Sequence, residues 1–453
     1  MAGTRRHWWL LGAMSGVLGL IVLDETIVAV SLPTISRDLG LSHAATHWVV
    51  NAYLLAFTCA VAVAGRFGDH FSRRSYFSAG ALLFALASLL AAVASDGATL
   101  IAARALQGMG AALIFPTSIA LITAAFAPEE RGTAFGYQTT VGGIFMASGP
   151  LIGGLLTETL SWRMIFWVGI PVVLGIAATL WLIWSPAYDG RGRGSLAAGK
   201  DLAGPVYLIA GLLGLVTAVM QGPFWGWTSP AILAMGLAGL GALMLFLWRE
   251  LSYPTPLLDL SLLKIPAFGG GVVIFALFQL EKIAVFVFAA QYFQEVLGRS
   301  PIQSGLAVSL AILPTLGTSV LVGRMSDRAG SRATLMRGVA LHGSALLAFA
   351  LATGQQNFLL ALAPLILWGA SMPSIAIPVR RVQMNSVPAD KHAQANGISL
   401  TVQMLGGSLG LALCSALVAE TQSYLALFLV VGCVTLLIVP IGARSMTPRP
   451  AIP

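Results

Sequence analysis

The chain has 453 residues, of which 57% are hydrophobic and only 9% are charged. Soluble globular domains carry about 25% charged residues, so this composition excludes an ordinary soluble protein and indicates a chain embedded in a lipid bilayer. The formal net charge of +8 comes from Lys and Arg residues scattered between long apolar runs, which argues against a nucleic-acid-binding surface. Cys59, Cys414 and Cys433 lie singly within apolar runs, so we expect them to pack as small apolar residues, without disulfides or a metal site.

Fourteen apolar runs are long enough to cross a hydrocarbon core, which takes about 20 helical residues. The first run follows Arg5 and Arg6 as a signal peptide would, but it is too long and carries Asp24 and Glu25 without a small-residue cleavage site. We interpret it as a retained helix. The sequence therefore predicts an all-α integral membrane protein with spans near residues 8–33, 46–66, 75–95, 98–125, 133–157, 163–184, 203–222, 229–248, 267–293, 303–323, 334–353, 357–379, 393–418 and 422–443.

The distribution of Lys and Arg gives an independent test of this number of spans. Basic residues near helix ends gather on the cytoplasmic side of a membrane. If the N-terminus is cytoplasmic, most of the 25 Lys and Arg fall in cytoplasmic segments, and only Arg37, Arg163 and Arg299 fall in outer loops. We therefore expect a multi-pass protein of the bacterial inner (plasma) membrane with both termini in the cytoplasm.

Two segments of the chain resemble each other. Gly65–Arg74 (GRFGDHFSRR) follows the second predicted helix, and Gly323–Arg332 (GRMSDRAGSR) follows the tenth, 258 residues later. Pro116 and Pro373 recur with nearly the same offset. Internal repeats are typical of secondary transporters. We therefore predict an N-terminal six-helix half (residues 1–185), a linker with two inserted helices (186–250) and a C-terminal six-helix half (251–453).

Two segments carry a specific pattern, Leu23 to Pro33 in the first predicted helix and Leu100 to Ala112 in the fourth. They are similar to the helix signatures of the fourteen-helix drug:proton antiporter-2 family of the major facilitator superfamily, which the chain resembles. The chain departs from the family pattern at His70, Ser72, Phe145 and Gly169. The resemblance implies a major facilitator fold that exports drugs in exchange for protons. It also implies a motif typical of exporters in the fifth helix, formed by Gly136, Gly149, Pro150, Gly153 and Gly154.

The repeated loops and the glycine-rich fifth helix also have physical interpretations of their own. Short loops bring charges to neighbouring helix ends, so we predict that these charges pair and hold one face of the protein closed; the alternative is that they only set topology. Small residues and proline suit a hinge or a tight helix contact, and plain packing is the alternative. The predicted gating residues are Asp69, Arg73, Arg74, Asp327, Arg328 and Arg332.

Charged residues within the spans are the strongest functional signal, because each costs about 2.5 to 3.5 kcal/mol to insert and usually marks a transport pathway. They are Asp24, Glu25, Arg104, Glu281 and Lys282, and the resemblance places their helices around the central cavity. Adjacent residues on a helix point about 100° apart, so one acid of a neighbouring pair can be structural. We favour Asp24 and Glu281 as working groups with Lys282 as a counter-ion, and we expect Asp24 to carry the coupling proton. His342 is interpreted as a packing residue.

The predicted function is proton-driven export of lipophilic or cationic compounds by alternating access. One alternative is an exporter or symporter of a single metabolite, such as a siderophore or a peptide. A membrane-embedded enzyme is disfavoured, because six dispersed histidines and three isolated cysteines offer no catalytic constellation. We expect no cofactor besides the proton gradient and no nucleic-acid partner. The expected partners are the lipid bilayer, protons and small-molecule substrates, and the sequence leaves a periplasmic adaptor protein open.

Overall fold

A computed structural model describes residues 2–68, 71–127, 130–189, 203–253, 259–388 and 391–446. The regular elements in these ranges are helices. Together they form fourteen spans that are long and apolar enough to cross a membrane, as predicted. The N-terminal half consists of α1 (Ala2–Asp38), α2 (His43–Gly68), α3 (Arg73–Ala92), α4 (Gly97–Ala125), α5 (Arg131–Thr159) and α6 (Met164–Leu182). The inserted pair is α7 (Ala203–Trp225) and α8 (Pro230–Ser252). The C-terminal half consists of α9 (Pro266–Gln291), α10 (Pro301–Ile312), α11 (Pro314–Ala329), α12 (Ser331–Gly354), α13 (Phe358–Ser371), α14 (Pro373–Asn385), α15 (His392–Thr421), α16 (Tyr424–Leu436) and α17 (Ile438–Ser445).

Three spans of the C-terminal half are each divided into two helices near a proline. Proline has no N–H to donate to the carbonyl four residues earlier, so it interrupts the helix while the chain continues in the same direction. Pro373 begins α14 in this way, and the Gly369 carbonyl accepts from the Met372 amide at 3.1 Å instead of from residue 373. The Thr315 hydroxyl of α11 donates to that carbonyl at 2.8 Å, so the two interrupted spans are hydrogen-bonded to each other at their breaks.

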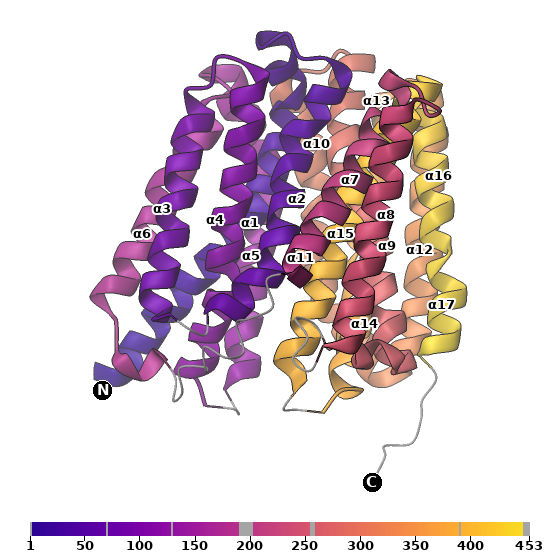
Figure 1. The fold of residues 1–453 in the computed structure, drawn as a ribbon. Helices are drawn as coiled ribbons and strands as arrows, with labels where there is room; N and C mark the ends of the chain where they lie inside the picture. The colour runs from indigo at the N-terminus through magenta and orange to yellow at the C-terminus, as the bar shows by residue number, and fades with distance from the viewer. Residues whose placement is uncertain are drawn as a thin grey trace.

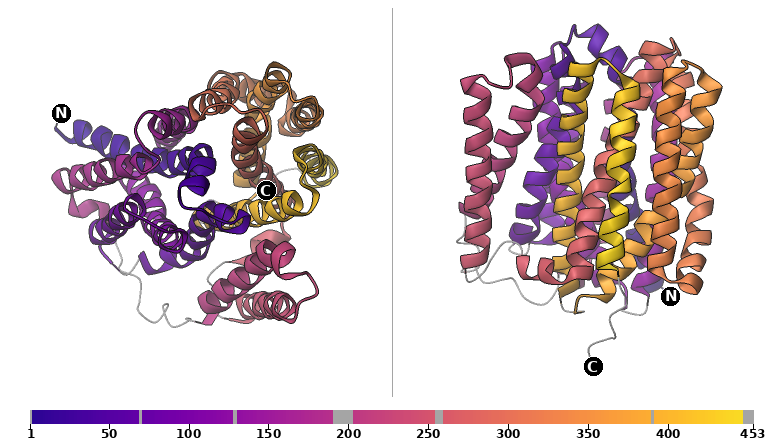
Figure 2. Two further views of the ribbon diagram at one scale, coloured as in Figure 1. Left: turned by 90° about the horizontal axis from the view of Figure 1, so that it is seen from above. Right: turned by 90° about the vertical axis from the view of Figure 1, so that its right-hand side faces the viewer.

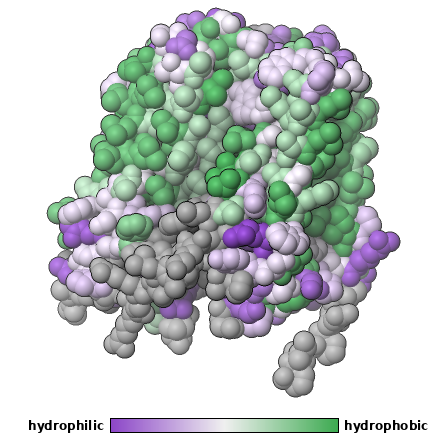
Figure 3. Space-filling view, viewed as in Figure 1, coloured by the Kyte–Doolittle hydropathy of each residue, from purple (hydrophilic) through white to green (hydrophobic). Residues whose placement is uncertain are grey.

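The two six-helix halves stand side by side, and the start of α1 and the end of α17 lie on the same face of the molecule (Figure 1). We call this face the terminal side and the opposite face the far side. Seen along the helices, α7 and α8 lie outside the ring formed by the other spans (Figure 2). Apolar residues cover the middle of the outer surface and polar residues gather toward its two ends, as expected for a protein surrounded by lipid (Figure 3).

The inserted helix α7 packs against both halves. It lies against α2 of the N-terminal half and α15 of the C-terminal half. The contact is an apolar cluster in which Leu55 and Cys59 of α2 and Ala412 of α15 meet Leu212 and Val216 of α7. The inserted pair therefore covers one of the two seams between the halves.

Hydrogen bonds between the halves gather toward the far side. The Gln294 side chain donates to the Val30 carbonyl at 2.7 Å, and the Ile302 amide donates to the Glu158 carboxylate at 2.8 Å. On the terminal side, a Cβ added to Gly136 of α5 or to Gly323 of α11 would meet no atom within 4 Å. The hydrogen bonds that join the halves in the described structure therefore lie mainly toward the far side.

Candidate functional site

The centre of the N-terminal half contains a buried ion pair between α1 and α4. Asp24 Oδ2 accepts a hydrogen bond from Arg104 Nη1 at 2.6 Å, and Asp24 Oδ1 accepts one from Gln107 Nε2 at 3.1 Å. Arg104 also donates through Nε to the carbonyl of Val49 at 3.0 Å, and its guanidinium carbon lies 4.4 Å from the ring centroid of Tyr53. Both oxygens of Asp24 are therefore bound within this half, and a permanently charged group compensates its charge.

Small residues of α4 bring this pair together. A Cβ on Gly108 would clash with the Tyr53 carbonyl of α2, and a Cβ on Gly110 would lie 2.7 Å from the Phe84 amide nitrogen of α3. These glycines let α4 pack closely against both neighbours. Arg104 lies one turn before Gly108, so the close packing directs its side chain into the interior, where Asp24 is its counter-ion.

The centre of the C-terminal half contains a second buried cluster, between α9, α12 and α13. Glu281 Oε1 lies 2.9 Å from His342 Nε2, and Glu281 Oε2 accepts a hydrogen bond from the Trp368 indole at 2.8 Å. His342 Nδ1 lies 2.7 Å from the Ser371 hydroxyl. Glu281, His342 and Trp368 are fully buried. This cluster therefore ties the first helix of its half to the third and the fourth.

The two halves meet between these clusters through Glu25 and Lys282. Glu25 Oε2 of α1 lies 3.8 Å from Lys282 Nζ of α9, and both side chains are almost completely buried. The Lys282 ammonium also lies 5.9 Å from the ring centroid of Phe286. This ion pair crosses from one half to the other, whereas the pairs of Asp24 and Glu281 stay within their own halves.

The five predicted charged residues fall into two groups. Asp24, Arg104 and Glu281 pair within one half, whereas Glu25 and Lys282 pair across the two halves. Asp24 and Glu25 have different partners, and so do Glu281 and Lys282, as the angle between adjacent helical residues requires. Lys282 faces Glu25 rather than either of the acids that the sequence favoured as working groups. His342, which we interpreted as a packing residue, contacts Glu281 directly. The available signal was that a histidine and an acid lay at interior positions of the same half.

The predicted gating residues that the structure describes lie at the terminal side, where Arg73, Arg74 and Asp327 contact residues outside the predicted set. Asp69 lies outside the described residues. Arg73 donates to the Tyr188 carbonyl at 2.6 Å, and Arg74 stacks on the ring of Trp181. Asp327 forms its ion pair with Arg381 of α14, whereas the sequence had suggested Arg328 and Arg332. The Asp327 pair thus connects α11 to α14 across the terminal face.

The glycine-rich segment of α5 contacts helices of both halves. Gly149 and Gly153 face α1, where a Cβ on Gly153 would lie 2.7 Å from the Ile27 carbonyl oxygen. Gly154 faces the Pro301 carbonyl of α10, and Gly305 of α10 in turn faces the Pro150 carbonyl. Side chains at these positions would force the helices apart, so the motif sets the distance between the two halves on the far side. Gly136 has open space beside it and takes no part in this contact.

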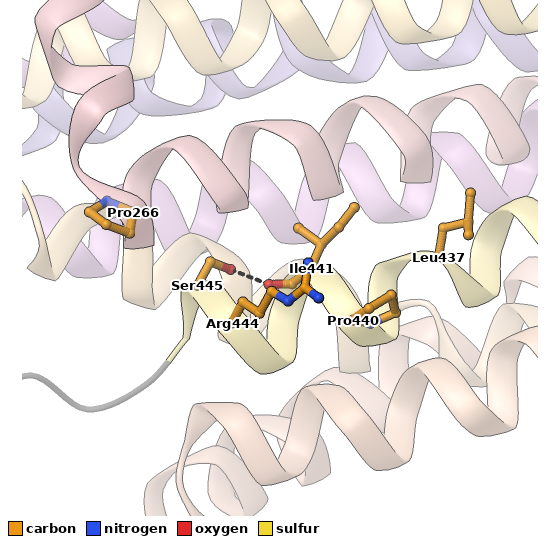
Figure 4. Close-up of a pocket in the computed structure, with 6 residues that line it drawn as sticks. All are labelled: Pro266, Leu437, Pro440, Ile441, Arg444 and Ser445. Carbon is orange, nitrogen blue, oxygen red and sulfur yellow. Dashed lines mark hydrogen bonds between the residues drawn. The ribbon is translucent and has the colours of Figure 1, made fainter.

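A groove at the terminal side is separate from the charged clusters. It has a volume of about 460 Å³ and lies between the start of α9 and the end of α17 (Figure 4). Arg444 is its charged residue, and the Ser445 hydroxyl donates to the Ile441 carbonyl at 2.7 Å. None of the residues predicted from the sequence lines this groove, so the candidate site remains the region between the two halves.

Comparisons with known proteins identify the family. The Major Facilitator Superfamily model matches residues 14–276, 204–411 and 271–451. The puromycin resistance protein of Streptomyces alboniger is 36% identical over 93% of this chain and 84% of its own length. The multidrug resistance protein Stp of Mycobacterium tuberculosis is 31% identical over 90% of this chain and 75% of its own length. The solved structure of the E. coli xylose transporter has the same fold, with a TM-score of 0.69 at 14% identity, and the match covers 96% of this chain and 97% of that one. The chain therefore belongs to the Major Facilitator Superfamily of membrane transporters.

Proposed function

We propose that the protein is a proton-driven antiporter that exports lipophilic or cationic compounds across the bacterial inner membrane by alternating access. The observation that carries this proposal is the Glu25 to Lys282 pair, in which an acid and a base from opposite halves meet inside the membrane. The relatives named for puromycin resistance and multidrug resistance support the direction of transport and the class of substrate.

The cross-half pair suggests how exchange is enforced. When the halves separate around Glu25, its carboxylate loses Lys282, and an unpaired buried charge costs several kcal/mol. A proton or a cationic substrate can then take the place of the lysine, and only one of them at a time. Returning to the present arrangement lets Lys282 displace the bound cation. Exchange of one proton for one monovalent cation moves no net charge, so the proton concentration gradient drives it. For a neutral substrate one net charge crosses, and 100 mV then contributes about 2.3 kcal/mol, enough for a gradient of roughly fifty-fold.

The decisive experiment measures ethidium-induced proton release from the full-length protein in proteoliposomes. We expect Glu25→Gln to abolish both uphill ethidium transport and ethidium-induced proton release. Asp24→Asn is the matched comparison on the next residue, because the sequence favoured Asp24 as the proton carrier. Undiminished release from Glu25→Gln together with loss in a folded Asp24→Asn would return the role to Asp24. Undiminished release from both would overturn the proposal that an acid of α1 carries the proton.

The orientation proposed here has both termini in the cytoplasm, which makes the terminal side cytoplasmic and the described structure inward-facing. The distribution of Lys and Arg supports it. Epitopes inserted at Gly226 or Gln355 should be accessible to antibody in intact spheroplasts, and an epitope after Pro453 should not. Labelling of the C-terminal epitope from outside would reverse the orientation.

Export of one specific metabolite is the second candidate function. The relative from Streptomyces alboniger favours it, since that protein is named for resistance to a single compound. Growth of a pump-deleted host with and without the gene, across a panel of dyes, biocides and antibiotics that includes puromycin, distinguishes the two. Protection against several unrelated cations supports multidrug export, and protection against one compound supports the specific exporter.

A further inference from the structure

The hydrogen bonds around His342 fix where its hydrogens lie. The Ser371 hydroxyl donates to the carbonyl of Trp368 at 2.7 Å, and a carbonyl can only accept. The single hydrogen of this hydroxyl is therefore used, and Ser371 accepts from His342 Nδ1 at 2.7 Å. Nδ1 of His342 accordingly carries a hydrogen in this arrangement.

The contact between His342 Nε2 and Glu281 Oε1 then requires one further proton. A carboxylate oxygen and an unprotonated ring nitrogen are both acceptors, and two acceptors do not approach to 2.9 Å without a hydrogen between them. Trp368 donates to the other oxygen of Glu281 at 2.8 Å, so it does not supply this hydrogen. The pair as a whole is electrically neutral, whether the shared proton lies nearer to the acid or to the ring. Neutrality suits a site with no solvent exposure, where a net charge is costly.

We propose that Glu281 and His342 hold one exchangeable proton and form a second proton-binding site, within the C-terminal half. On release, the proton passes from the Nε2 to Oε1 contact to water as hydronium, and it leaves a carboxylate beside a neutral imidazole. These two acceptors repel each other, so the contact between α9 and α12 opens. Uptake of a proton restores it.

The partner of Glu281 makes this site exchangeable. Histidine can bind and release a proton, whereas an arginine stays charged. Lys282 is the neighbouring residue on α9 and faces Glu25 of the other half. A change in the contact between α9 and α12 therefore acts on the same helix that carries the cross-half ion pair. The use of this proton in transport rests on the proposed antiport, whereas its exchange does not.

The described helices packed around the pair bring no other charged group to it. Within their bounds, α10, α13 and α16 contain no Asp, Glu, Lys, Arg or His. The three acids of α1, Asp24, Glu25 and Asp38, are engaged with Arg104, Lys282 and Arg163 respectively. The charged residues of the remaining neighbours lie within two turns of a helix end, near the membrane faces; these are Arg324, Asp327, Arg328, Arg332, Arg337, Arg380, Arg381, His392, Glu420 and Arg444.

A titration without any substrate tests the site. Infrared difference spectra of the full-length protein in lipid nanodiscs are recorded over a series of pH values. We expect a carboxyl signal and an imidazole signal that change together in the wild type. Glu281→Gln should remove both, because the Gln amide donates to Nε2 and accepts from Trp368 without a titrating proton. Glu295→Gln, which changes an exposed acid at the end of the same span, is the matched control, and it should keep both signals. A wild-type spectrum that Glu281→Gln leaves unchanged would overturn the proposal.

Two further measurements keep the outcome clear. If Glu281→Gln does not fold, wild-type protein with ring-labelled histidine is compared with His342→Gln; a His342 signal that stays constant over the same range overturns the proposal.

In proteoliposomes, Glu281→Gln should release about half as many protons per ethidium as the wild type, since one of two coupled sites is lost. If the wild type titrates but ethidium releases no protons, the proposed antiport fails and the proton site stands. Full release from folded Glu281→Gln leaves the antiport intact and overturns a role of the site in it.

Discussion

The centres of the two halves have the same plan and different chemistry. In each half, an acid on the first helix is bound by a side chain of the fourth span, and a residue of the third belongs to the same cluster. Asp24 is bound by Arg104 and Gln107 of α4, and Gln107 also bonds Ser88 of α3. Glu281 is bound by His342 of α12 and Trp368 of α13. The two repeats therefore keep an acid at the same position, and the residue paired with it, Arg104 or His342, determines whether a proton can be released.

The largest expected loss of stability follows a change in the buried ion pair of the N-terminal half. Asp24→Asn leaves the fully buried Arg104 without its counter-ion, and breaking a buried pair from one side costs about 3 to 5 kcal/mol. We expect a clear loss of thermal stability of the purified protein in detergent. The double variant Asp24→Asn with Arg104→Gln should regain most of it, because no buried charge remains. A double variant as unstable as the single one would show that Arg104 has other essential partners.

A second prediction concerns the indole that binds Glu281. Trp368→Phe removes the donor to Oε2 inside the protein, and an unsatisfied buried acceptor costs about 1 to 3 kcal/mol. The matched control is Trp162→Phe, whose indole donates to Asp38 where water can replace it. Thermal unfolding should separate the two variants, with the smaller change at Trp162. Equal changes would mean that ring packing, rather than the hydrogen bond, stabilises the C-terminal centre.

A third prediction extends the comparison to the terminal faces. Asp327→Asn and Arg381→Gln should each slow transport while leaving ethidium affinity unchanged, because the ion pair lies away from the cavity and biases the two states. The pair is half exposed, so its contribution is at most about 1 kcal/mol, which corresponds to roughly a fivefold change. Asp69→Asn tests the equivalent loop of the N-terminal half. Wild-type rates in all three variants would make these charges topology signals only.

The smallest expected change is in the stability of Glu281→Gln. The amide keeps both hydrogen bonds of the carboxyl, so the free energy of unfolding should change by less than about 1 kcal/mol. The same substitution type on the other half, Asp24→Asn, destabilises strongly for the reason given above. Similar losses of stability in both variants would contradict the difference between Arg104, which stays charged, and His342, which exchanges a proton.

The sequence was sufficient to predict the fold. Fourteen long apolar runs, the asymmetry of Lys and Arg, and the repeat between Gly65–Arg74 and Gly323–Arg332 together predicted the spans that the structure contains. The divisions of spans within the C-terminal half were not predicted. Pro373 was visible, but whether a proline bends a helix or divides it depends on what satisfies the carbonyl four residues earlier, here the Met372 amide and the hydroxyl of Thr315 from another span.

The charged residues of the site were found from the sequence, but their pairing was not. Burial of a charge follows from its position in an apolar run, whereas its partner depends on how the helices rotate against one another. Lys282 therefore appeared equally near to several acids, and the structure places it against Glu25. The partner of Asp327 was missed for a related reason, because Arg381 follows it by 54 positions and only helix packing brings the two together.

The position of the inserted helices affects how the halves can move. Because α7 touches α2 and α15, any change of angle between the halves must occur by sliding along its surface. That surface is formed by smooth aliphatic side chains such as Leu212 and Val216. Its polar contact from Asn51 is to the sulfur of Met220, a weak acceptor that adjusts easily. The inserted pair can therefore cover the seam and keep lipid out of it while the halves move in the proposed alternating access, because few specific contacts have to break.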